Sequence, residues 1–286
     1  MIMAQIIDGK AVSAAVRANV REQTEQLKAK GITPGLAVII VGDDPASRVY
    51  VNNKKKACLD VGFYSEEYAM PADTTMEQLC EVIDTLNARD DIDGILCQLP
   101  LPKHLDEKAV IDRIDPSKDV DAFSPANVGK IMIGDYDFLP CTPAGVMELL
   151  KAYNIDANGK NCVVIGRSNI VGKPMAMLLL HANGTVTVCH SKTQNIADIT
   201  SKADIFVAAV GRANFVTADM VKDGAVVIDV GMNRVDGKLC GDVDFAAVEP
   251  KASYITPVPG GVGPMTIGML MKNTLKAAKL HHGVND

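Results

Sequence analysis

The stretch from Cys162 to Lys192 constrains the fold of this chain more than any other. Apolar runs, glycines and a proline divide it into four parts. They predict a strand, a polar turn, a helix and a second strand, at 162–165, 166–172, 174–180 and 185–189. Such a unit directs backbone N–H groups and the positive end of a helix dipole at an anion, most often a nucleotide phosphate.

The two glycines of the turn, Gly166 and Gly172, are spaced more widely than in the GxGxxG fingerprint of dinucleotide sites. The turn alone therefore also fits an ordinary α/β layer with a solvated surface. The charges around it are more informative. No acidic residue occurs between Asp156 and Asp198, whereas four basic residues do: Lys160, Arg167, Lys173 and Lys192.

This charge pattern favours NADP over NAD. An NAD site usually places Asp or Glu at the end of its second strand, to accept a hydrogen bond from the ribose 2′-OH. Without that acid, a phosphate at the 2′ position is the better fit. We predict that Arg167 pairs with the 2′-phosphate and that Ser168 and Ser191 donate neutral hydrogen bonds to it.

Length and charge exclude several classes of protein. With 286 residues, 48% of them hydrophobic, the chain is long enough for two domains, each with its own core. The net charge of −6 and a pI near 5.4 argue against nucleic acid as a partner. No apolar run reaches the ~18 residues of a membrane span, and the N-terminal residues do not resemble a signal peptide. We therefore expect a cytoplasmic protein.

The metal-binding residue types show no ligand spacing. The seven cysteines are odd in number and scattered without a CxxC pair, which is typical of reduced thiols packed as small hydrophobic groups. The five histidines form no HExxH or similar motif. We predict no metal site.

Hydrophobic periodicity predicts an α/β fold throughout. In the first half, helices are predicted at 13–30, 45–61, 75–87 and 106–114, strands at 36–41, 63–70 and 94–97, and a polar loop at 115–130. In the second half, Thr142 and Pro143 predict the start of a helix at the domain junction. Further strands are expected at 205–211, 225–231 and 253–258. A long helix is expected from Pro264, and it should pack on the first domain.

These elements predict two three-layer domains. We place the first at 1–139 plus 269–286 and the second at 140–268. The second is expected to be a Rossmann-like, doubly wound parallel sheet. Glycines follow two of its predicted strands, in AAVGR and IDVGMN, where a cofactor would approach the backbone closely.

Lys54 and Tyr50 are candidate catalytic residues on the 45–61 helix, where they share a face with Ala57 and Val61. A lysine at such a position is most often a snorkelling stem, and a tyrosine most often a core residue with its hydroxyl at the edge. Alternatively, a partly desolvated amine can accept and return protons, and the tyrosine can orient it or stack on a flat ligand.

Further candidates, one glutamine and three acidic residues, lie in the first half of the chain. Gln98 lies at the carboxyl end of the 94–97 strand, where open α/β sheets hold their ligands, although a glutamine there is more often structural. Asp115, Asp119 and Asp121 lie in the polar loop. Such acids usually serve as solvated turn and cap residues, but one of them can face a cleft.

Seven segments in this order resemble the bifunctional methylenetetrahydrofolate dehydrogenase/methenyltetrahydrofolate cyclohydrolase family, known as FolD in bacteria. They cover nearly the whole chain and are highly specific together. They are YVNNK (50–54), GILCQLPLP (94–102), KDVDAF (118–123), PCTPAG (140–145), VVIGRSNIVGKP (163–174), CHSKT (189–193) and PVPGGVGPMT (257–266).

The resemblance implies two reactions in one cleft between the domains. NADP takes a hydride from 5,10-methylenetetrahydrofolate, and the methenyl cation that results is hydrolysed to 10-formyltetrahydrofolate. It also implies a homodimer joined through the nucleotide domain. A cyclohydrolase-only enzyme and a catalytically silent NADP- or folate-binding protein are the alternatives, and turnover distinguishes them. A short-chain dehydrogenase, with Tyr50 and Lys54 as its YxxxK, is disfavoured because that motif would follow the nucleotide loop.

The resemblance also implies roles for individual residues. Lys54 looks like the lysine that activates water and transfers protons, and Gln98 like its hydrogen-bond partner. Tyr50 looks like the residue that stacks on the folate, and Asp121 like the carboxylate that recognises the amino edge of the pterin. The remaining implied positions are Gly166, Arg167, Ser168, Ser191 and Met232 at the NADP site, and the turn beginning Gly260 and Gly261 at the cleft.

The chain departs from the family pattern at two positions. Many relatives read DVDGFH where this chain reads DVDAFS, with Ala122 and Ser124. If residue 122 has a positive φ, alanine strains the loop. The histidine side chain has no counterpart here.

Overall fold

The computed structural model describes residues 4–284 and divides the chain into two compact units. Unit 1 takes in the residues up to Ser13 and Pro140–Thr266, and unit 2 takes in Ala14–Leu139 and the residues from Ile267. We expected domains at 1–139 plus 269–286 and at 140–268, of which residues 1–3 and 285–286 lie outside the described part. Residues 4–13 belong to unit 1 instead of unit 2, because the strand that they contain pairs with the sheet of unit 1.

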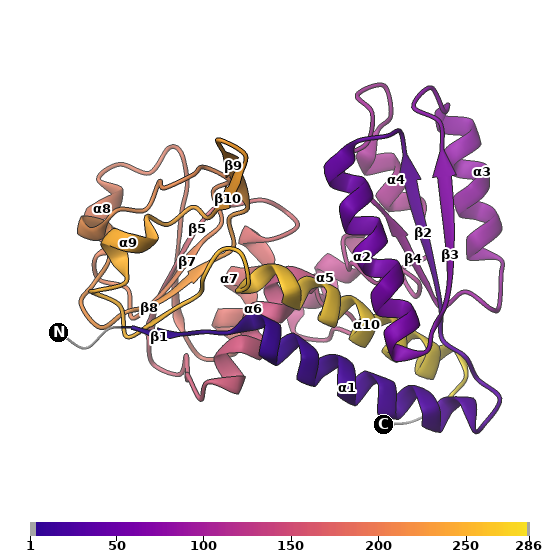
Figure 1. The fold of residues 1–286 in the computed structure, drawn as a ribbon, viewed down its shortest axis with the longest axis horizontal. Helices are drawn as coiled ribbons and strands as arrows, with labels where there is room; N and C mark the ends of the chain where they lie inside the picture. The colour runs from indigo at the N-terminus through magenta and orange to yellow at the C-terminus, as the bar shows by residue number, and fades with distance from the viewer. Residues whose placement is uncertain (1–3, 285–286) are drawn as a thin grey trace. The chain divides into compact units, whose positions relative to one another are not determined.

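Unit 2 contains a three-stranded parallel sheet in the order β3-β2-β4. The strands are β2 (Gly35–Val41), β3 (Tyr64–Met70) and β4 (Gly94–Cys97). The continuous apolar run of β2 makes it the buried central strand, whereas β3, with two glutamates, is a half-exposed edge. In Figure 1, α2 (Pro45–Val61) and α3 (Met76–Asn87) flank these strands. The other helices that contribute to this unit are α1 (Gly9–Lys28), α4 (Glu107–Arg113), α5 (Pro125–Ile133) and α10 (Val262–His281).

The ends of α2 follow from local chemistry. The side chain of Asp44 accepts a hydrogen bond from the Ser47 backbone N–H at 2.7 Å, and Pro45 occupies the first helical position. Gly62 ends the helix in the left-handed conformation, at a φ of 83°. The predicted bounds of this helix, which carries Tyr50 and Lys54, are therefore confirmed.

The prediction of a polar loop over 115–130 was wrong in its second half. Residues from Pro125 form α5, whose N-cap Ser124 accepts a hydrogen bond from the Asn127 backbone N–H at 3.3 Å. Gly134 ends this helix at a φ of 82°. The Ser-Pro pair is itself a helix start, so the sequence carried this information.

Unit 1 contains a six-stranded sheet in the order β1-β11-β8-β7-β5-β6, and every pair in it is parallel. The predicted doubly wound parallel sheet is confirmed. The strands are β1 (Gln5–Ile6), β5 (Asn161–Ile165), β6 (Thr185–Cys189), β7 (Ile205–Ala208), β8 (Val226–Asp229) and β11 (Tyr254–Ile255). The helical segments are α6 (Cys141–Ala152), α7 (Gly172–His181), α8 (Ile196–Thr200), η1 (Ala218–Met220) and α9 (Phe245–Val248).

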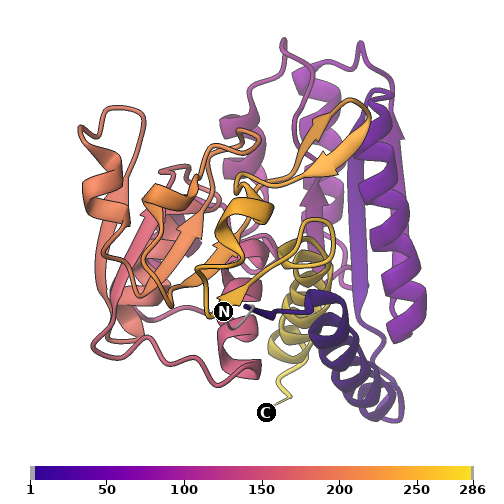
Figure 2. The same ribbon diagram turned by 60° about the vertical axis from the view of Figure 1, so that its left-hand side comes forward.

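Three features of unit 1 were not anticipated. Strand β1 pairs with β11. Strands β9 (Asn233–Val235) and β10 (Lys238–Cys240) form a separate hairpin, which Figure 2 shows apart from the main sheet. The Asp-Gly turn of that hairpin is a common hairpin sequence. Helix α6 begins at Cys141, and the Thr142 hydroxyl lies 2.9 Å from that of Thr266 instead of capping the helix.

Each unit has its own hydrophobic core. In unit 1 the core gathers around β5, β7 and β8, and in unit 2 around β2, β4 and α3. From Ile267, α10 belongs to unit 2, and its Met271 sulfur lies 3.8 Å from the Cys58 sulfur. The seven cysteines form no disulfide in the described part of the chain, and burial raises the pKa of the Cys58 and Cys162 thiols to about 11.

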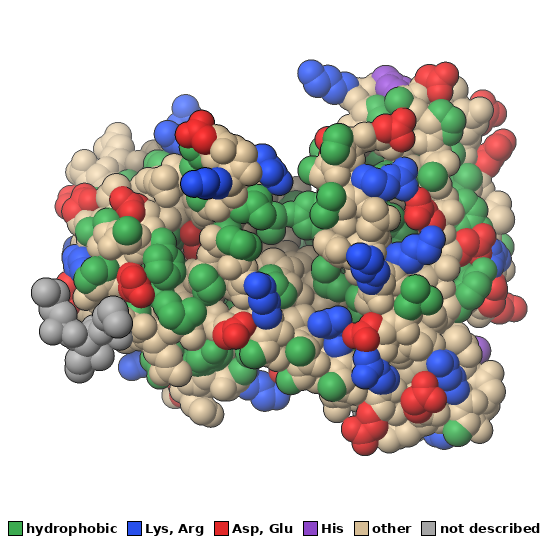
Figure 3. Space-filling view, in the orientation of Figure 1, with side chains coloured by type: hydrophobic (Ala, Val, Ile, Leu, Met, Phe, Trp, Pro, Cys, Tyr) green, Lys and Arg blue, Asp and Glu red, His purple; other side chains and the backbone are tan. Residues whose placement is uncertain are grey.

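The surface carries charges of both signs. On the face shown in Figure 3, basic and acidic side chains are interspersed. Within residues 4–284, no helix combines the length and the apolar character that a membrane crossing requires.

Candidate functional site

Lys54 is buried and hydrogen bonded inside unit 2. Only 8% of its surface is exposed, and its Nζ donates to Oε1 of Gln98 at 2.9 Å. The other end of the Gln98 amide donates to the Leu99 carbonyl at 2.6 Å, which fixes its orientation. Helix α2 and the carboxyl end of β4 thus bring Lys54 and Gln98 together. A snorkelling stem with its ammonium in water does not describe this lysine.

Tyr50 lies one helical turn before Lys54 on α2 and is 37% exposed. Partial burial raises the pKa of its hydroxyl, so the side chain stays a neutral phenol near neutral pH. A raised pKa does not favour the proton donation that the short-chain dehydrogenase alternative requires of this tyrosine. A half-exposed ring beside a buried lysine instead suits contact with a flat ligand.

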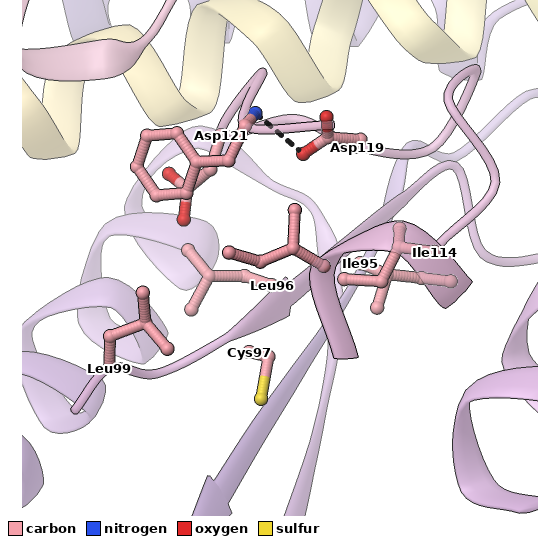
Figure 4. A pocket seen from close by; sticks show the side chains of 9 residues that line it. Ile95, Leu96, Cys97, Leu99, Ile114, Asp119 and Asp121 are labelled. Carbon is pink, nitrogen blue, oxygen red and sulfur yellow. Dashed lines mark hydrogen bonds between the residues drawn. The ribbon is translucent and has the colours of Figure 1, made fainter. Parts of the chain in front are cut away.

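Asp121 lines a pocket in unit 2 together with Asp119, Phe123 and apolar side chains from β4 and α4. Figure 4 shows Asp119 and Asp121 on one side of this pocket and the apolar side chains of Ile95, Leu96 and Ile114 on the other. Burial raises the pKa of the Cys97 thiol to about 12; the negative charge of Asp121 raises this pKa further, whereas the positive charge of Lys54 lowers it. Charges of both signs therefore lie near this sulfur.

Asp119 organises the loop that carries Asp121. Its carboxylate is buried and accepts hydrogen bonds from the backbone N–H groups of Phe123 at 3.2 Å and Ser124 at 2.8 Å, and from the Asn127 side chain at 2.9 Å. From α10, the Asn273 side chain donates to the Val120 carbonyl at 2.7 Å. Sequence reasoning treated Asp119 as a solvated turn acid and missed this role, because its partners become visible only in the folded loop.

The two departures from the family pattern lie in this same loop. Ala122 is fully buried and has a φ of 56°, in the left-handed region that costs an L-residue about 1–2 kcal/mol. The strain that we anticipated at this position is therefore present. Ser124, in place of histidine, serves as the N-cap of α5.

Replacing Ala122 with valine should destabilise unit 2 by at least about 2 kcal/mol, since a β-branched side chain tolerates positive φ least and the site is buried. Ala122→Gly is the matched control. There, relief of about 1–2 kcal/mol of strain is offset by the loss of a buried methyl and by the entropy of glycine, so stability should change by no more than about 1 kcal/mol. Denaturant unfolding measures both variants, and an equally stable valine variant would contradict the positive φ.

The predicted nucleotide loop of unit 1 requires glycine at its start. Gly166 has a φ of 126°, and a Cβ added there would lie 2.2 Å from the carbonyl oxygen of Ala209. A Cβ on Gly172 would lie 2.3 Å from the Gly166 carbonyl oxygen. The loop after β5 is therefore packed backbone against backbone, which leaves no room for a side chain at either position.

Ser168 holds the beginning of α7. Its hydroxyl oxygen accepts hydrogen bonds from the backbone N–H groups of Val171 and Gly172, each at 3.2 Å. Both contacts use the oxygen as acceptor, so the hydroxyl proton remains available to an external acceptor. Ser168 and Arg167 are exposed at this helix N-terminus, and a helix N-terminus favours an anion.

Arg167 and Ser191 follow neighbouring strands at the same edge of the sheet. Ile165 at the end of β5 is paired in register with Cys189 at the end of β6, so the residues just beyond them are adjacent. Ser191 is exposed in a turn that begins with the His190 backbone N–H donating to the Thr193 hydroxyl at 2.9 Å. Lys160, by contrast, precedes β5 at the amino edge, away from Arg167.

Met232 and the glycine-rich turn after β11 are adjacent in unit 1. A Cβ on Gly263 would lie 3.1 Å from Cε of Met232, whose side chain is exposed. Gly260 has a φ of 111°, and a Cβ on Gly261 would lie 2.6 Å from the Pro257 carbonyl oxygen. Among residues 4–284, no group of three or more histidine, cysteine or acidic side chains is arranged to hold a metal ion.

Comparison with known proteins identifies the family. Residues 7–121 match the tetrahydrofolate dehydrogenase/cyclohydrolase catalytic domain, and residues 140–282 match the NAD(P)-binding domain of the same family. This chain belongs to the tetrahydrofolate dehydrogenase/cyclohydrolase family. The bifunctional protein FolD of Acetivibrio thermocellus is 63% identical over 278 residues, which cover 97% of this chain and 98% of that protein. FolD of Moorella thermoacetica is 60% identical over 96% of this chain and 99% of its own length.

Solved structures agree with this assignment. The bifunctional FolD of Campylobacter jejuni matches with a TM-score of 0.95 and 52% identity, over 97% of this chain and 99% of that one. Trypanosoma brucei FolD, complexed with NADP cofactor and an inhibitor, matches with a TM-score of 0.95 and 42% identity over 100% of both chains. The predicted family, its α/β fold with a Rossmann-like domain, and its two enzymatic activities are confirmed.

Proposed function

We propose that this tetrahydrofolate dehydrogenase/cyclohydrolase oxidises 5,10-methylenetetrahydrofolate with NADP and then hydrolyses 5,10-methenyltetrahydrofolate to 10-formyltetrahydrofolate. The observation that supports this most strongly is the hydrogen bond of 2.9 Å between the buried Nζ of Lys54 and Oε1 of Gln98. An amine in this setting is positioned and shielded from bulk water, as proton transfer to a bound substrate requires.

NADP is the cofactor, and the residues present fit it. Ser168, which precedes the N-terminus of α7, accepts from two backbone N–H groups and can donate its hydroxyl proton to a phosphate oxygen, and the positive end of the helix dipole favours the same anion. Arg167 and Ser191 lie at the ends of β5 and β6, where the adenosine ribose binds in such sheets. Their charge and donors suit a 2′-phosphate. Bound there, NADP would supply the hydride acceptor for oxidation of the methylene carbon.

In the oxidation, the chain's own residues position the substrate. Tyr50 stacks on the flat folate ring system, and Asp121 accepts hydrogen bonds from the amino edge of the pterin. Asp119 and Asn273 hold the loop of Asp121 in place. In unit 1, Met232 lines the position of the cofactor, and the turn at Gly260 and Gly261 lines the position of the substrate. Since hydride transfer needs mainly alignment, no dedicated proton-transfer residue is required.

In the hydrolysis, Lys54 transfers protons. Water adds to the electrophilic methenyl carbon, and the Lys54 amine accepts a proton from it. The carbon–N5 bond then breaks as Lys54 returns this proton to N5, and the remaining hydroxyl proton is lost to solvent as the C=O bond forms, which leaves a formyl group on N10. Gln98 orients the amine through its Oε1. Because the methenyl carbon is already cationic, a modest base suffices.

The same proposal includes a cytoplasmic homodimer joined through unit 1. Sedimentation of the purified protein tests the dimer: a mass near 61 kDa, about twice the 30.4 kDa of one chain, supports it, and a mass of one chain contradicts it.

The purified protein should reduce NADP in preference to NAD when supplied with 5,10-methylenetetrahydrofolate. Absorbance of the reduced nicotinamide follows the reaction. A lack of reduction with either cofactor, in protein shown by circular dichroism to be folded, would instead indicate a cyclohydrolase-only enzyme or a binding protein. Hydrolysis of 5,10-methenyltetrahydrofolate, measured separately, distinguishes these two.

A further inference from the structure

Two buried carboxylates lie at the carboxyl edge of the six-stranded sheet of unit 1, and the proposed chemistry uses neither of them. Asp229 is the last residue of β8 and is 3% exposed; Asp242, shortly after β10, is 0% exposed. Burying a carboxylate costs several kcal/mol unless hydrogen bonds compensate it. The partners of these two groups therefore indicate what they do.

Asp242 gathers the loop that follows β7. Its Oδ2 accepts hydrogen bonds from the backbone N–H groups of Val210 at 2.6 Å and Gly211 at 3.0 Å. Its Oδ1 accepts from the backbone N–H of Arg212 at 2.8 Å and from the Asn233 side chain at 2.9 Å. Three successive backbone amides and one side chain thus donate to a single carboxylate. Such charge-assisted hydrogen bonds are stronger than hydrogen bonds between neutral groups.

Asp229 fixes Asp242 in turn. It accepts hydrogen bonds from the backbone N–H groups of Gly231, Asp242 and Val243, each at 2.9 Å. Burial raises the pKa of Asp229 to about 6, and the Asp242 charge contributes to the rise, whereas the three backbone hydrogen bonds oppose it. The two carboxylates therefore form one close pair that connects the ends of β7, β8 and β10.

The backbone around this pair is packed too tightly for side chains. A Cβ on Gly231 would lie 2.3 Å from Cγ of Asp242, and a Cβ on Gly241 would lie 1.8 Å from Oδ2 of Asp229. Met232, a candidate cofactor residue, stands between Gly231 and Asn233, which are both held by the pair. The position of Met232 is thus set by the two carboxylates.

The same loop also contacts the nucleotide loop. Ala209 precedes the three amides that Asp242 holds, and its carbonyl oxygen lies against Gly166, where a Cβ would come within 2.2 Å. In sheets of this kind the pyrophosphate binds after the first strand and the adenosine ribose at the end of the second, here β5 and β6. The nicotinamide half must then extend over the ends of β7 and β8, where the carboxylate pair lies.

We propose that Asp242 is a positioning residue for hydride transfer: its carboxylate shapes the 209–212 and 231–233 loops into the surface on which the nicotinamide half of NADP rests. This inference rests on the proposed dehydrogenase function. Asp242 acts through the backbone that it holds and does not touch the reacting atoms.

Asp242→Asn tests the proposal in the full-length protein. The amide keeps one oxygen but turns an NH₂ group towards backbone N–H donors, so the loops must shift. We expect the dehydrogenase kcat at saturating NADP to fall at least about tenfold, as expected when reacting groups are misplaced. Hydrolysis of 5,10-methenyltetrahydrofolate, assayed without NADP, should stay within about twofold of the unchanged protein because Lys54 belongs to unit 2.

A second measurement distinguishes positioning from general damage to unit 1. Adenosine 2′,5′-bisphosphate carries only the adenosine half of the cofactor, so its inhibition constant should change by less than about twofold in Asp242→Asn. The proposal would be overturned if Asp242→Asn weakened adenosine 2′,5′-bisphosphate binding as strongly as it lowers kcat. It would also be overturned if the dehydrogenase kcat of this variant stayed within about twofold of that of the unchanged protein. If the unchanged protein reduces no NADP at all, the proposed function fails instead, and this outcome is recognisable without any variant.

Two further variants complete the test. Asp204→Asn is the matched control, because Asp204 lies at the opposite, amino edge of the same sheet, where it accepts from the Asn161 backbone N–H at 2.9 Å. This variant should leave kcat unchanged.

Asn233→Ala removes one hydrogen bond to Asp242 from a half-buried position, and it tests the role of Asp242 if Asp242→Asn does not fold. We expect about a threefold fall in kcat or more there, with adenosine 2′,5′-bisphosphate inhibition unchanged, and no fall in kcat would overturn the proposal.

Discussion

Replacing Lys54 with methionine is expected to abolish the hydrolysis of 5,10-methenyltetrahydrofolate while folate binding is retained. Methionine fills most of the space of the buried lysine stem but cannot accept or return a proton. Loss of a general acid–base group typically lowers a rate by about 100- to 10,000-fold. The oxidation of 5,10-methylenetetrahydrofolate should lose much less, because hydride transfer depends on alignment.

Lys56→Met is the matched control for this experiment. Lys56 lies on the same helix two residues further along, and its side chain is exposed. Its hydrolysis rate should stay within about twofold of the unchanged protein, as is usual for an exposed residue without a structural role. Undiminished hydrolysis by Lys54→Met, in protein that still binds folate, would remove Lys54 from the proton-transfer role.

Replacing Arg167 with alanine should weaken the binding of NADP much more than that of NAD. The lost interaction is a charge-assisted hydrogen bond to the 2′-phosphate, worth about 1.5–3 kcal/mol, which corresponds to about a 10- to 150-fold rise in the KM for NADP. NAD has no phosphate there, so its KM should change little. Initial rates with both cofactors, at a fixed concentration of 5,10-methylenetetrahydrofolate, measure the ratio.

Lys160→Ala controls for a general loss of positive charge. Lys160 belongs to the same basic stretch of sequence but lies at the amino edge of the sheet, before β5. Its removal should leave the preference for NADP unchanged. An Arg167→Ala variant with the preference of the unchanged protein would mean that another group binds the 2′-phosphate.

Local patterns predicted the elements that carry the proposed site. The apolar runs of β2, β4 and β5 are long enough to identify buried parallel strands, and Asp44, Pro45 and Gly62 mark the ends of α2 by their own hydrogen bonds and backbone conformations. Lys54 was singled out because helical periodicity places it on a buried face. Its contact with Gln98, however, joins residues 44 positions apart, and only the folded sheet brings them together.

The acidic residues were the hardest to predict. Asp119 was expected to be a solvated loop residue, and no role was predicted for Asp229 or Asp242, because carboxylates are seldom buried. In the structure they are buried, and backbone amides compensate their charge.

By itself, the sequence determined the family, the strands and helices that carry the proposed site, and the chemistry available at the ends of those strands, because these depend on residue type and on spacing along the chain. Only the tertiary structure decided that Asp242 holds a loop about 30 residues earlier in the chain and that Ala122 adopts a positive φ. The physical reason is that hydrophobic periodicity reports which face of an element is buried. It does not report which distant backbone groups a buried carboxylate will meet there.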